Sequence, residues 1–208
     1  DDDDDDDDDD GDVDDDAAAF PLARRRTNDA DVRQRQTTFL AQRLVARGRR
    51  DEGLQLIGDY AETRGNDYNA LVAAGEVFTV AQSQRAAREF LERARELAPG
   101  RDEAPLALAR LARQQGKLRE SAALYEEVSA RNPESVPAWL GVAETAQARG
   151  DLNRAWAALD AAQRVAPASA LVYRERLRIS FRERDAETFF AVLRDYHRTQ
   201  PQDVWVQL

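Results

Sequence analysis

The chain has 208 residues, 42% of them hydrophobic, with no Cys and a formal net charge of −10. This length fits one domain or a short repeat array, and the apolar content is sufficient for a buried core. Without Cys, disulfides and thiolate metal sites are excluded, and no apolar run approaches the ~18 residues of a membrane-spanning helix. No signal peptide is recognisable and the chain contains no Met, so we expect it to be a piece of a longer protein.

The negative charge is concentrated at the N-terminus. Residues 1–16 contain 14 of the 40 acidic residues, which leaves 26 acidic against 30 basic residues in 17–208. A run of like charges cannot bury enough apolar surface to offset the entropy of ordering, so 1–16 is predicted to be a disordered poly-Asp leader. Weak calcium binding and nucleic-acid mimicry are the alternatives, but the ligand spacing of a calcium loop is absent.

Residues 17–33 are predicted to be a linker that leads into the first helix. Pro21 and the cluster Arg24-Arg25-Arg26 suggest a linker, and a helical pattern begins near Asp31. Three arginines without interleaved aromatic residues are weak evidence for nucleic-acid binding, so no nucleic-acid partner is expected.

The strongest feature is a repeat of 34 residues. Pro99, Pro133, Pro167 and Pro201 follow this step, and a fixed period of this size decides the architecture. Small and large residues keep the same register: Ala87, Ser121 and Ala155; Leu91, Tyr125 and Leu159; Ala94, Val128 and Ala162; Gly116 and Gly150.

The segment from Val136 to Ser169 carries the pattern most fully. It contains, in order, Trp139, Val142-Ala143, Ala155, Leu159, Ala162 and Pro167. This order resembles the tetratricopeptide repeat family, which implies an all-α fold: a right-handed α-solenoid of about five helix-turn-helix repeats. The implied units are 34–67, 68–101, 102–135, 136–169 and 170–203, with 204–208 starting a truncated next repeat. The flanking units depart from the pattern, because Gly65 replaces a proline and Phe189 fills a slot that usually holds Ala.

Hydrophobic periodicity within each unit independently predicts two amphipathic helices. In the third unit these span about Glu103–Gln115 and Leu118–Ala130. Gly116 can end the first helix in a left-handed conformation, and Pro133 disfavours helix in the residue before it. One such pair cannot bury its apolar face alone, so neighbouring units must stack.

The sequence contains no recognisable catalytic set. Its single His, His197, has no Cys partner, and a surface position is the favoured interpretation. No phosphate-binding loop or dinucleotide turn is present. We therefore expect no catalytic residues, no cofactor, no bound metal and no enzyme activity.

The resemblance implies that the first helix of each unit lines a concave groove. The predicted partner-binding residues are the polar positions on that face: Asn69, Glu76, Thr79, Glu103, Arg110, Arg113, Gln114, Glu144, Gln147, Arg174, Arg178 and Arg182. An acidic or extended peptide would suit the basic part of this set, because guanidinium groups bind carboxylates in a bidentate manner. The alternative is that these residues form ordinary solvated helix faces.

Two specialisations of the family are not matched. The carboxylate clamp of chaperone-binding members needs Lys and Asn where this chain has Thr38, Gln42, Ala73, Glu103 and Ala107. The asparagine ladder of members fused to sugar transferases is replaced by Phe39, Ala73, Ala107, Gly141 and Glu175.

The predicted function is therefore a non-catalytic protein–protein interaction scaffold that binds a protein or peptide. The Ala- and Arg-rich composition suggests a bacterial protein. Its array resembles those of bacterial envelope and exopolysaccharide-export assemblies, and this analogy favours the periplasm over the cytoplasm. The alternative is a regulatory or substrate-docking arm of an enzyme whose catalytic domain lies outside this chain. The sequence leaves the oligomeric state open.

Overall fold

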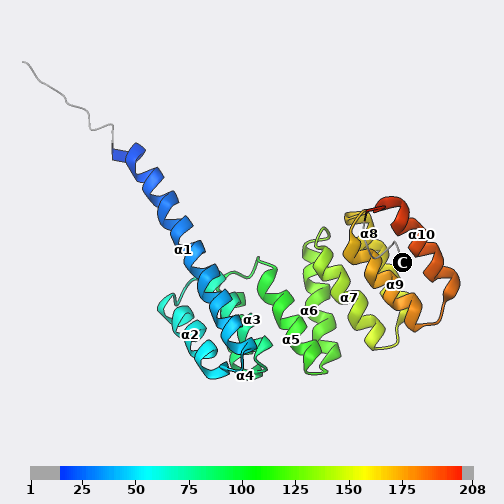
Figure 1. Ribbon diagram of the computed structural model, residues 1–208, viewed down its shortest axis with the longest axis horizontal. Coiled ribbons are helices and arrows are strands. Elements are labelled where there is room, and N and C mark those ends of the chain that lie inside the picture. The colour runs from blue at the N-terminus through cyan, green and yellow to red at the C-terminus, as the bar shows by residue number, and fades with distance from the viewer. Residues whose placement is uncertain (1–14, 203–208) are drawn as a thin grey trace, which may run out of the picture.

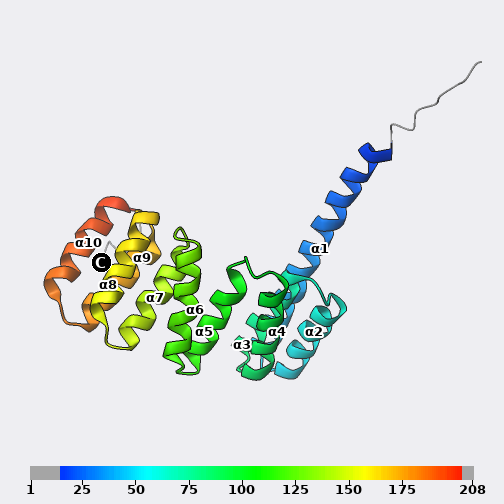
Figure 2. The same ribbon diagram turned by 180° about the vertical axis from the view of Figure 1, so that it is seen from behind.

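In the computed structural model, residues 15–202 are described, and they form consecutive α-helices joined by short turns. Side chains are described from residue 30 onward. The helices are α1 (Asp15–Ala46), α2 (Arg50–Thr63), α3 (Tyr68–Val80), α4 (Gln84–Leu97), α5 (Glu103–Gln114), α6 (Leu118–Arg131), α7 (Val136–Ala148), α8 (Leu152–Val165), α9 (Ala170–Arg182) and α10 (Ala186–Thr199). Successive pairs of antiparallel helices stand side by side in chain order (Figure 1 and, from behind, Figure 2). The prediction of an all-α array of about five helix pairs is confirmed.

The segment expected to be a linker is helical instead. Residues 17–33 lie within α1, which begins at Asp15, and the N-terminal part of this helix projects from the array (Figure 1). From residue 22 to residue 47 the sequence contains no Gly or Pro and many strong helix formers, so the helix is not interrupted there. Residues 1–14, most of the predicted acidic leader (1–16), and residues 203–208, which include the predicted start of a further repeat (204–208), lie outside the described residues.

The turn inside each helix pair is built in the same way five times. Left-handed backbone occurs at Gly48, Gln82, Gly116, Gly150 and Arg184, each 34 residues after the previous one. The next residue donates its backbone N–H to the carbonyl five positions earlier, as in Lys117 to Ala112 at 2.9 Å. This arrangement satisfies carbonyls left free at the helix end. The turn therefore follows the repeat even where glycine is missing.

Side chains also mark where several helices begin. Asp67, Ser135 and Ser169 precede the first helices α3, α7 and α9, and each accepts a hydrogen bond from a backbone N–H of the first turn. Asp151 and Asp185 do the same for α8 and α10. Such caps satisfy donors that the helix itself leaves unpaired.

The cap of α5 comes from the neighbouring unit. Asp102 precedes this helix but makes no capping bond with its side chain, because its carboxylate accepts from Arg131 and Asn132. Instead, the Tyr68 hydroxyl accepts from the backbone N–H of Ala104 at 3.0 Å and donates to Glu103 at 3.1 Å. This hydroxyl therefore joins the second unit to the third.

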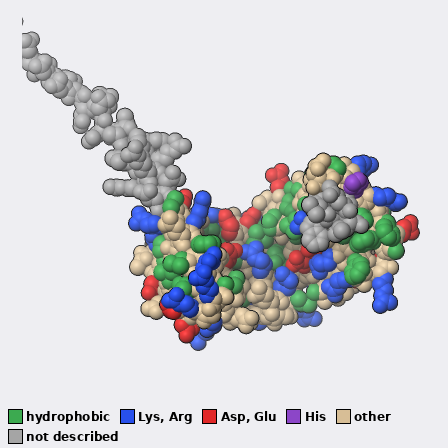
Figure 3. Space-filling model, viewed as in Figure 1, with side chains coloured by type: hydrophobic (Ala, Val, Ile, Leu, Met, Phe, Trp, Pro, Cys, Tyr) green, Lys and Arg blue, Asp and Glu red, His purple; other side chains and the backbone are tan. Residues whose placement is uncertain are grey.

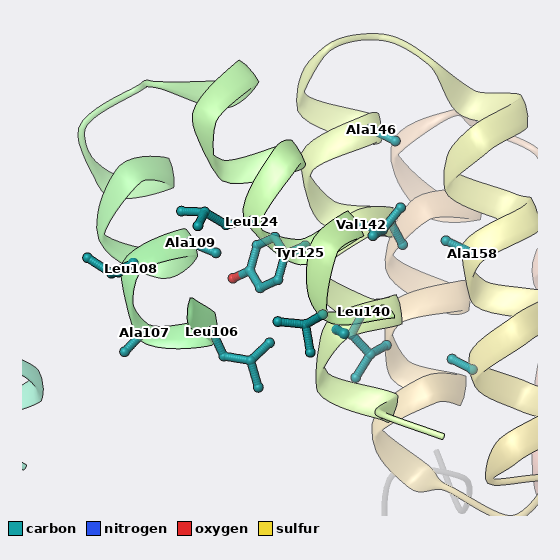
Figure 4. Packing of buried hydrophobic residues seen from close by; sticks show 14 of the residues in the cluster. Leu106, Ala107, Leu108, Ala109, Leu124, Tyr125, Leu140, Val142, Ala146 and Ala158 are labelled. Atoms are coloured by element: carbon teal, nitrogen blue, oxygen red, sulfur yellow. The ribbon is translucent and has the colours of Figure 1, made fainter. Parts of the chain in front are cut away.

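The core runs through the array because each unit packs on the next. The ring of Tyr125, only 3% exposed, lies among residues of α5 and α7 (Figure 4). A Cβ atom added at Gly141 would lie 2.2 Å from this ring, so the close approach of α7 to α6 requires glycine there. Ser121 is fully buried and donates to the carbonyl of Ala109 at 2.8 Å, which holds α6 close to α5.

The fifth pair packs differently. The slot occupied by the fully buried Ala87, Ser121 and Ala155 in earlier units holds the half-buried Phe189. Tyr173 and Tyr196 instead stack with ring centroids 4.9 Å apart and form a small cluster with Val192. An aromatic ring in place of a small residue prevents the same close packing, so α10 buries fewer residues than the other second helices.

The turn at Gln82 generates a stability prediction. A non-glycine residue in left-handed backbone costs about 1–2 kcal/mol, so Gln82→Gly should raise the free energy of unfolding by about 1 kcal/mol. Gly116→Ala, the reciprocal change at the equivalent turn, should lower it by a similar amount. Urea denaturation of the full chain measures both changes, and a destabilised Gln82→Gly variant would contradict the left-handed turn.

The Tyr68 cap generates a second prediction. Tyr68→Phe leaves the buried N–H of Ala104 without its acceptor, so it should destabilise the array by about 1–2 kcal/mol. Tyr60→Phe is the matched control, because the buried Tyr60 hydroxyl has no hydrogen-bond partner in the described part of the chain. The control should be neutral or stabilising in thermal and urea unfolding. Equal effects of the two substitutions would refute the capping role.

Candidate functional site

The first helices of the pairs form the inner side of the array. Among the described residues, α1 contacts α3, α3 contacts α5, α5 contacts α7 and α7 contacts α9, whereas no two second helices approach each other in this way. The stack is therefore tighter on the side of the first helices and curves toward it. This geometry makes the first helices the concave face.

All the predicted groove residues belong to these first helices. Asn69, Glu76 and Thr79 lie on α3, and Glu103, Arg110, Arg113 and Gln114 on α5; Glu144 and Gln147 lie on α7, and Arg174, Arg178 and Arg182 on α9. Basic and acidic side chains lie side by side over the middle of the molecule in the space-filling view (Figure 3).

Two ion pairs link neighbouring units across this face. Arg110 contacts Glu76 at 2.7 Å, and Arg113 contacts Glu144 at 3.2 Å. Exposed pairs of this kind contribute only about 0–1 kcal/mol to stability. Their larger effect is that two of the predicted basic residues already have a carboxylate beside them.

Other predicted residues are engaged away from the centre of the face. The carboxylate of Glu103 accepts from Arg101, and this hydrogen bond holds its pKa below the ordinary value. The Thr79 hydroxyl donates to the carbonyl of Gly75 in its own helix. The backbone carbonyl of Asn69 accepts from Gln34 at the N-terminal end of the array. The structure does not bring these three residues together with the arginines of α9.

One hollow gathers five of the predicted residues. It encloses ≈ 320 Å³ where α5, α7 and α9 meet, and it is lined by Arg113, Leu118, Glu144, Gln147, Ala148, Glu175, Arg178 and Arg182. The sequence prediction missed Leu118, Ala148 and Glu175. Glu175 contacts Arg178 at 2.5 Å, and its spacing of three residues on one helix was the available signal.

The polar contacts of Gln147 are incomplete. This side chain is 7% exposed, and its Oε1 accepts a hydrogen bond of 3.4 Å from Arg182. Its Nε2 is buried without a partner among the described residues. A buried donor without an acceptor costs about 1–3 kcal/mol, so this amide is the polar group of the hollow that most lacks a partner.

A second hollow lies where α9 turns into α10. It encloses ≈ 640 Å³, and its apolar wall is formed by Phe181, Phe189 and Phe190. Phe181 is 74% exposed and Phe190 is 57% exposed. Phe181 occupies the repeat position of Gln147, one unit further along the chain. Phe181 was not among the predicted groove residues, because that prediction considered only polar side chains.

The described residues offer no site for a metal and no membrane span. No group of three or more His, Asp or Glu side chains in this part of the chain is arranged to hold a metal ion. None of the described helices combines the length and apolarity needed to cross a bilayer. His197 is exposed in the last turn of α10.

Comparisons with known proteins agree with this architecture. Residues 112–175 match the family model of the tetratricopeptide repeat, whereas no curated protein sequence matches the chain. Similar solved structures include pilF of Pseudomonas aeruginosa (TM-score 0.63, 14% identity, 85% of this chain and 80% of that chain) and MamA (TM-score 0.61, 12% identity, 78% and 95%). YrrB, described as a TPR protein with an unusual peptide-binding site, aligns with a TM-score of 0.56 and 15% identity over 82% and 88%.

Because these solved structures are only 12%, 14% and 15% identical to the chain, they show that it shares their fold and say nothing about its function. The matched segment covers the second helix of the third pair, the whole fourth pair and the start of the fifth, including Tyr125, Gly141 and Gln147. Residues 112–175 thus match the tetratricopeptide repeat, and they lie within an all-α array of stacked helix pairs.

Proposed function

We propose that the chain is a non-catalytic protein–protein interaction scaffold that binds an extended, acidic segment of a partner along α3, α5, α7 and α9. The observation that carries this proposal is the hollow at the junction of α5, α7 and α9, where Arg113, Arg178 and Arg182 converge. Guanidinium groups match carboxylates in geometry and charge. Tetratricopeptide repeats mediate protein–protein interactions.

The shape of the inner face supports an extended ligand. Four successive first helices line it, and an extended segment gains about 3.3 Å per residue, so a short peptide contacts several units at once. The peptide-binding site described for YrrB, whose fold this chain shares, is a further reason to examine peptides first.

Selection from a displayed library of random 12-residue peptides on the immobilised full chain tests this proposal. We expect enrichment of Asp- and Glu-rich peptides whose affinity falls about tenfold between 50 and 500 mM salt, because salt screens exposed charges. Amide NMR shifts on peptide addition should map to α5, α7 and α9. Charge reversal of Arg95, which pairs with Glu127 between the second helices, is the control and should not change the affinity.

Two results would reject the proposal. One is a selection that enriches no peptide above the background of the support. The other is a set of shifts confined to α4, α6 and α8, which would place binding on the outer face.

We also propose, by analogy with bacterial envelope arrays of this fold and from the Ala- and Arg-rich composition, that the array works in a bacterial envelope or polysaccharide-secretion assembly, with the periplasm favoured. Fractionation of the source cells tests this placement independently of the groove. Recovery of the full-length protein in the cytoplasmic fraction would contradict it.

A further inference from the structure

The arginines of the inner face differ in whether a carboxylate already accompanies them. Arg110 pairs with Glu76, Arg113 with Glu144, and Arg178 with Glu175. Among the described residues, Arg182 pairs with no carboxylate and donates one long hydrogen bond, 3.4 Å, to Oε1 of Gln147. A guanidinium has five N–H donors, so Arg182 has the capacity to bind a further acceptor.

The amide of Gln147 needs an acceptor at the same place. Arginine has no acceptor atom, so the bond from Arg182 fixes the amide with its oxygen toward the guanidinium and its nitrogen away from it. That nitrogen is buried and has no partner among the described residues. Arg182 and Gln147 therefore present two neighbouring groups of hydrogen-bond donors, and no carboxylate among the described residues accepts from either group.

The same repeat position is satisfied in the earlier units. One unit back, Arg113 pairs with Glu144, and two units back, Thr79 bonds to its own helix. The unpaired donor at Gln147 is thus not a general property of the groove. It is a local feature of the junction between α7 and α9.

We propose that Arg182 and Gln147 form a subsite for a single carboxylate, the side chain of an Asp or Glu in the acidic segment of the proposed function, on which this inference rests. The carboxylate binds the guanidinium of Arg182 in a bidentate manner. When Arg182 turns toward the ligand, Oε1 of Gln147 loses its donor, and the amide rotates so that Nε2 donates to the same carboxylate. The hollow of ≈ 320 Å³ lies at the lower end of the range of ligand pockets.

The surroundings favour a carboxylate over a phosphate. Glu144 and Glu175 line the same hollow as Arg182. These two carboxylates already pair with Arg113 and Arg178, so among the described residues Arg182 is left as the one positive charge of the hollow to be neutralised. A carboxylate neutralises it, whereas a phosphate dianion brings a second negative charge close to Glu144 and Glu175. The subsite should therefore select one acidic side chain and not a phosphorylated one.

The test uses the ¹⁵N-labelled full chain and a blocked peptide, acetyl-Gly-Ala-Glu-Ala-Gly-amide, with its Gln-containing twin as the neutral control. We expect the Glu peptide to shift the side-chain amide signals of Gln147 and the Nε–H signal of Arg182 in a saturable titration. The neutral twin should bind at least tenfold more weakly. Inorganic phosphate at the same concentration should leave these signals unchanged.

Two variants test the roles of the two residues. Gln147→Glu places a carboxylate beside Arg182, so it should weaken binding at least tenfold while the melting temperature stays the same or rises. Arg182→Gln should weaken binding to the same extent. The control is Arg95→Gln, an arginine of the outer side that pairs with Glu127, and it should change the affinity less than twofold.

The outcomes separate this inference from the proposed function. The inference is overturned if Gln147→Glu retains full affinity, if Arg95→Gln weakens binding as much as Arg182→Gln, or if phosphate binds as well as the Glu peptide. It is also overturned if library-selected peptides bind the inner face but are insensitive to both variants, and in that case the proposed function stands. If neither the Glu peptide nor any selected peptide shifts the inner face, the proposed function itself fails.

Discussion

The structure depends on one constraint, which is that a pair of amphipathic helices leaves an apolar face uncovered until another pair stacks on it. Residues that the period places in equivalent positions are therefore buried against the next unit, as with Leu91 and Leu159. Stacking at a constant angle also brings the first helices together and separates the second helices. The concave face is a consequence of core packing, and its existence does not depend on any residue that lines it.

Polar contacts between units follow from the same geometry. On the outer side, where the second helices do not approach closely, long side chains span the distance, as Arg93 does to Glu62 at 2.6 Å and Arg95 to Glu127 at 2.8 Å. On the inner side, Arg110 and Arg113 reach the unit before and the unit after α5. Exposed pairs of this kind add little stability singly, but they decide which charges remain available to a partner.

The helix boundaries could be predicted from the sequence, because the residues that begin and end each helix act locally and recur with the 34-residue period. The predicted helix Glu103–Gln115 is observed as Glu103–Gln114, and its partner, predicted to end at Ala130, ends at Arg131. The left-handed turns at Gln82 and Arg184 were not predicted, because neither residue favours that conformation and only stacking imposes it. Residues 17–30 are helical where a linker was predicted, because the single Pro21 is followed by a long run without a helix breaker.

For the candidate site, the sequence could place residues on the inner face but could not pair them. Placement needs only the repeat register, whereas pairing depends on the rotation between units and on the side-chain rotamers. Arg110, Arg113 and Arg182 are equivalent in sequence reasoning, yet the first two have carboxylate partners and the third lies against a half-satisfied amide. Paired arginines bring desolvation costs to a ligand that must first displace their partners. Under the proposed function, specificity resides in the few donors that packing leaves unsatisfied, and not in the total positive charge of the face.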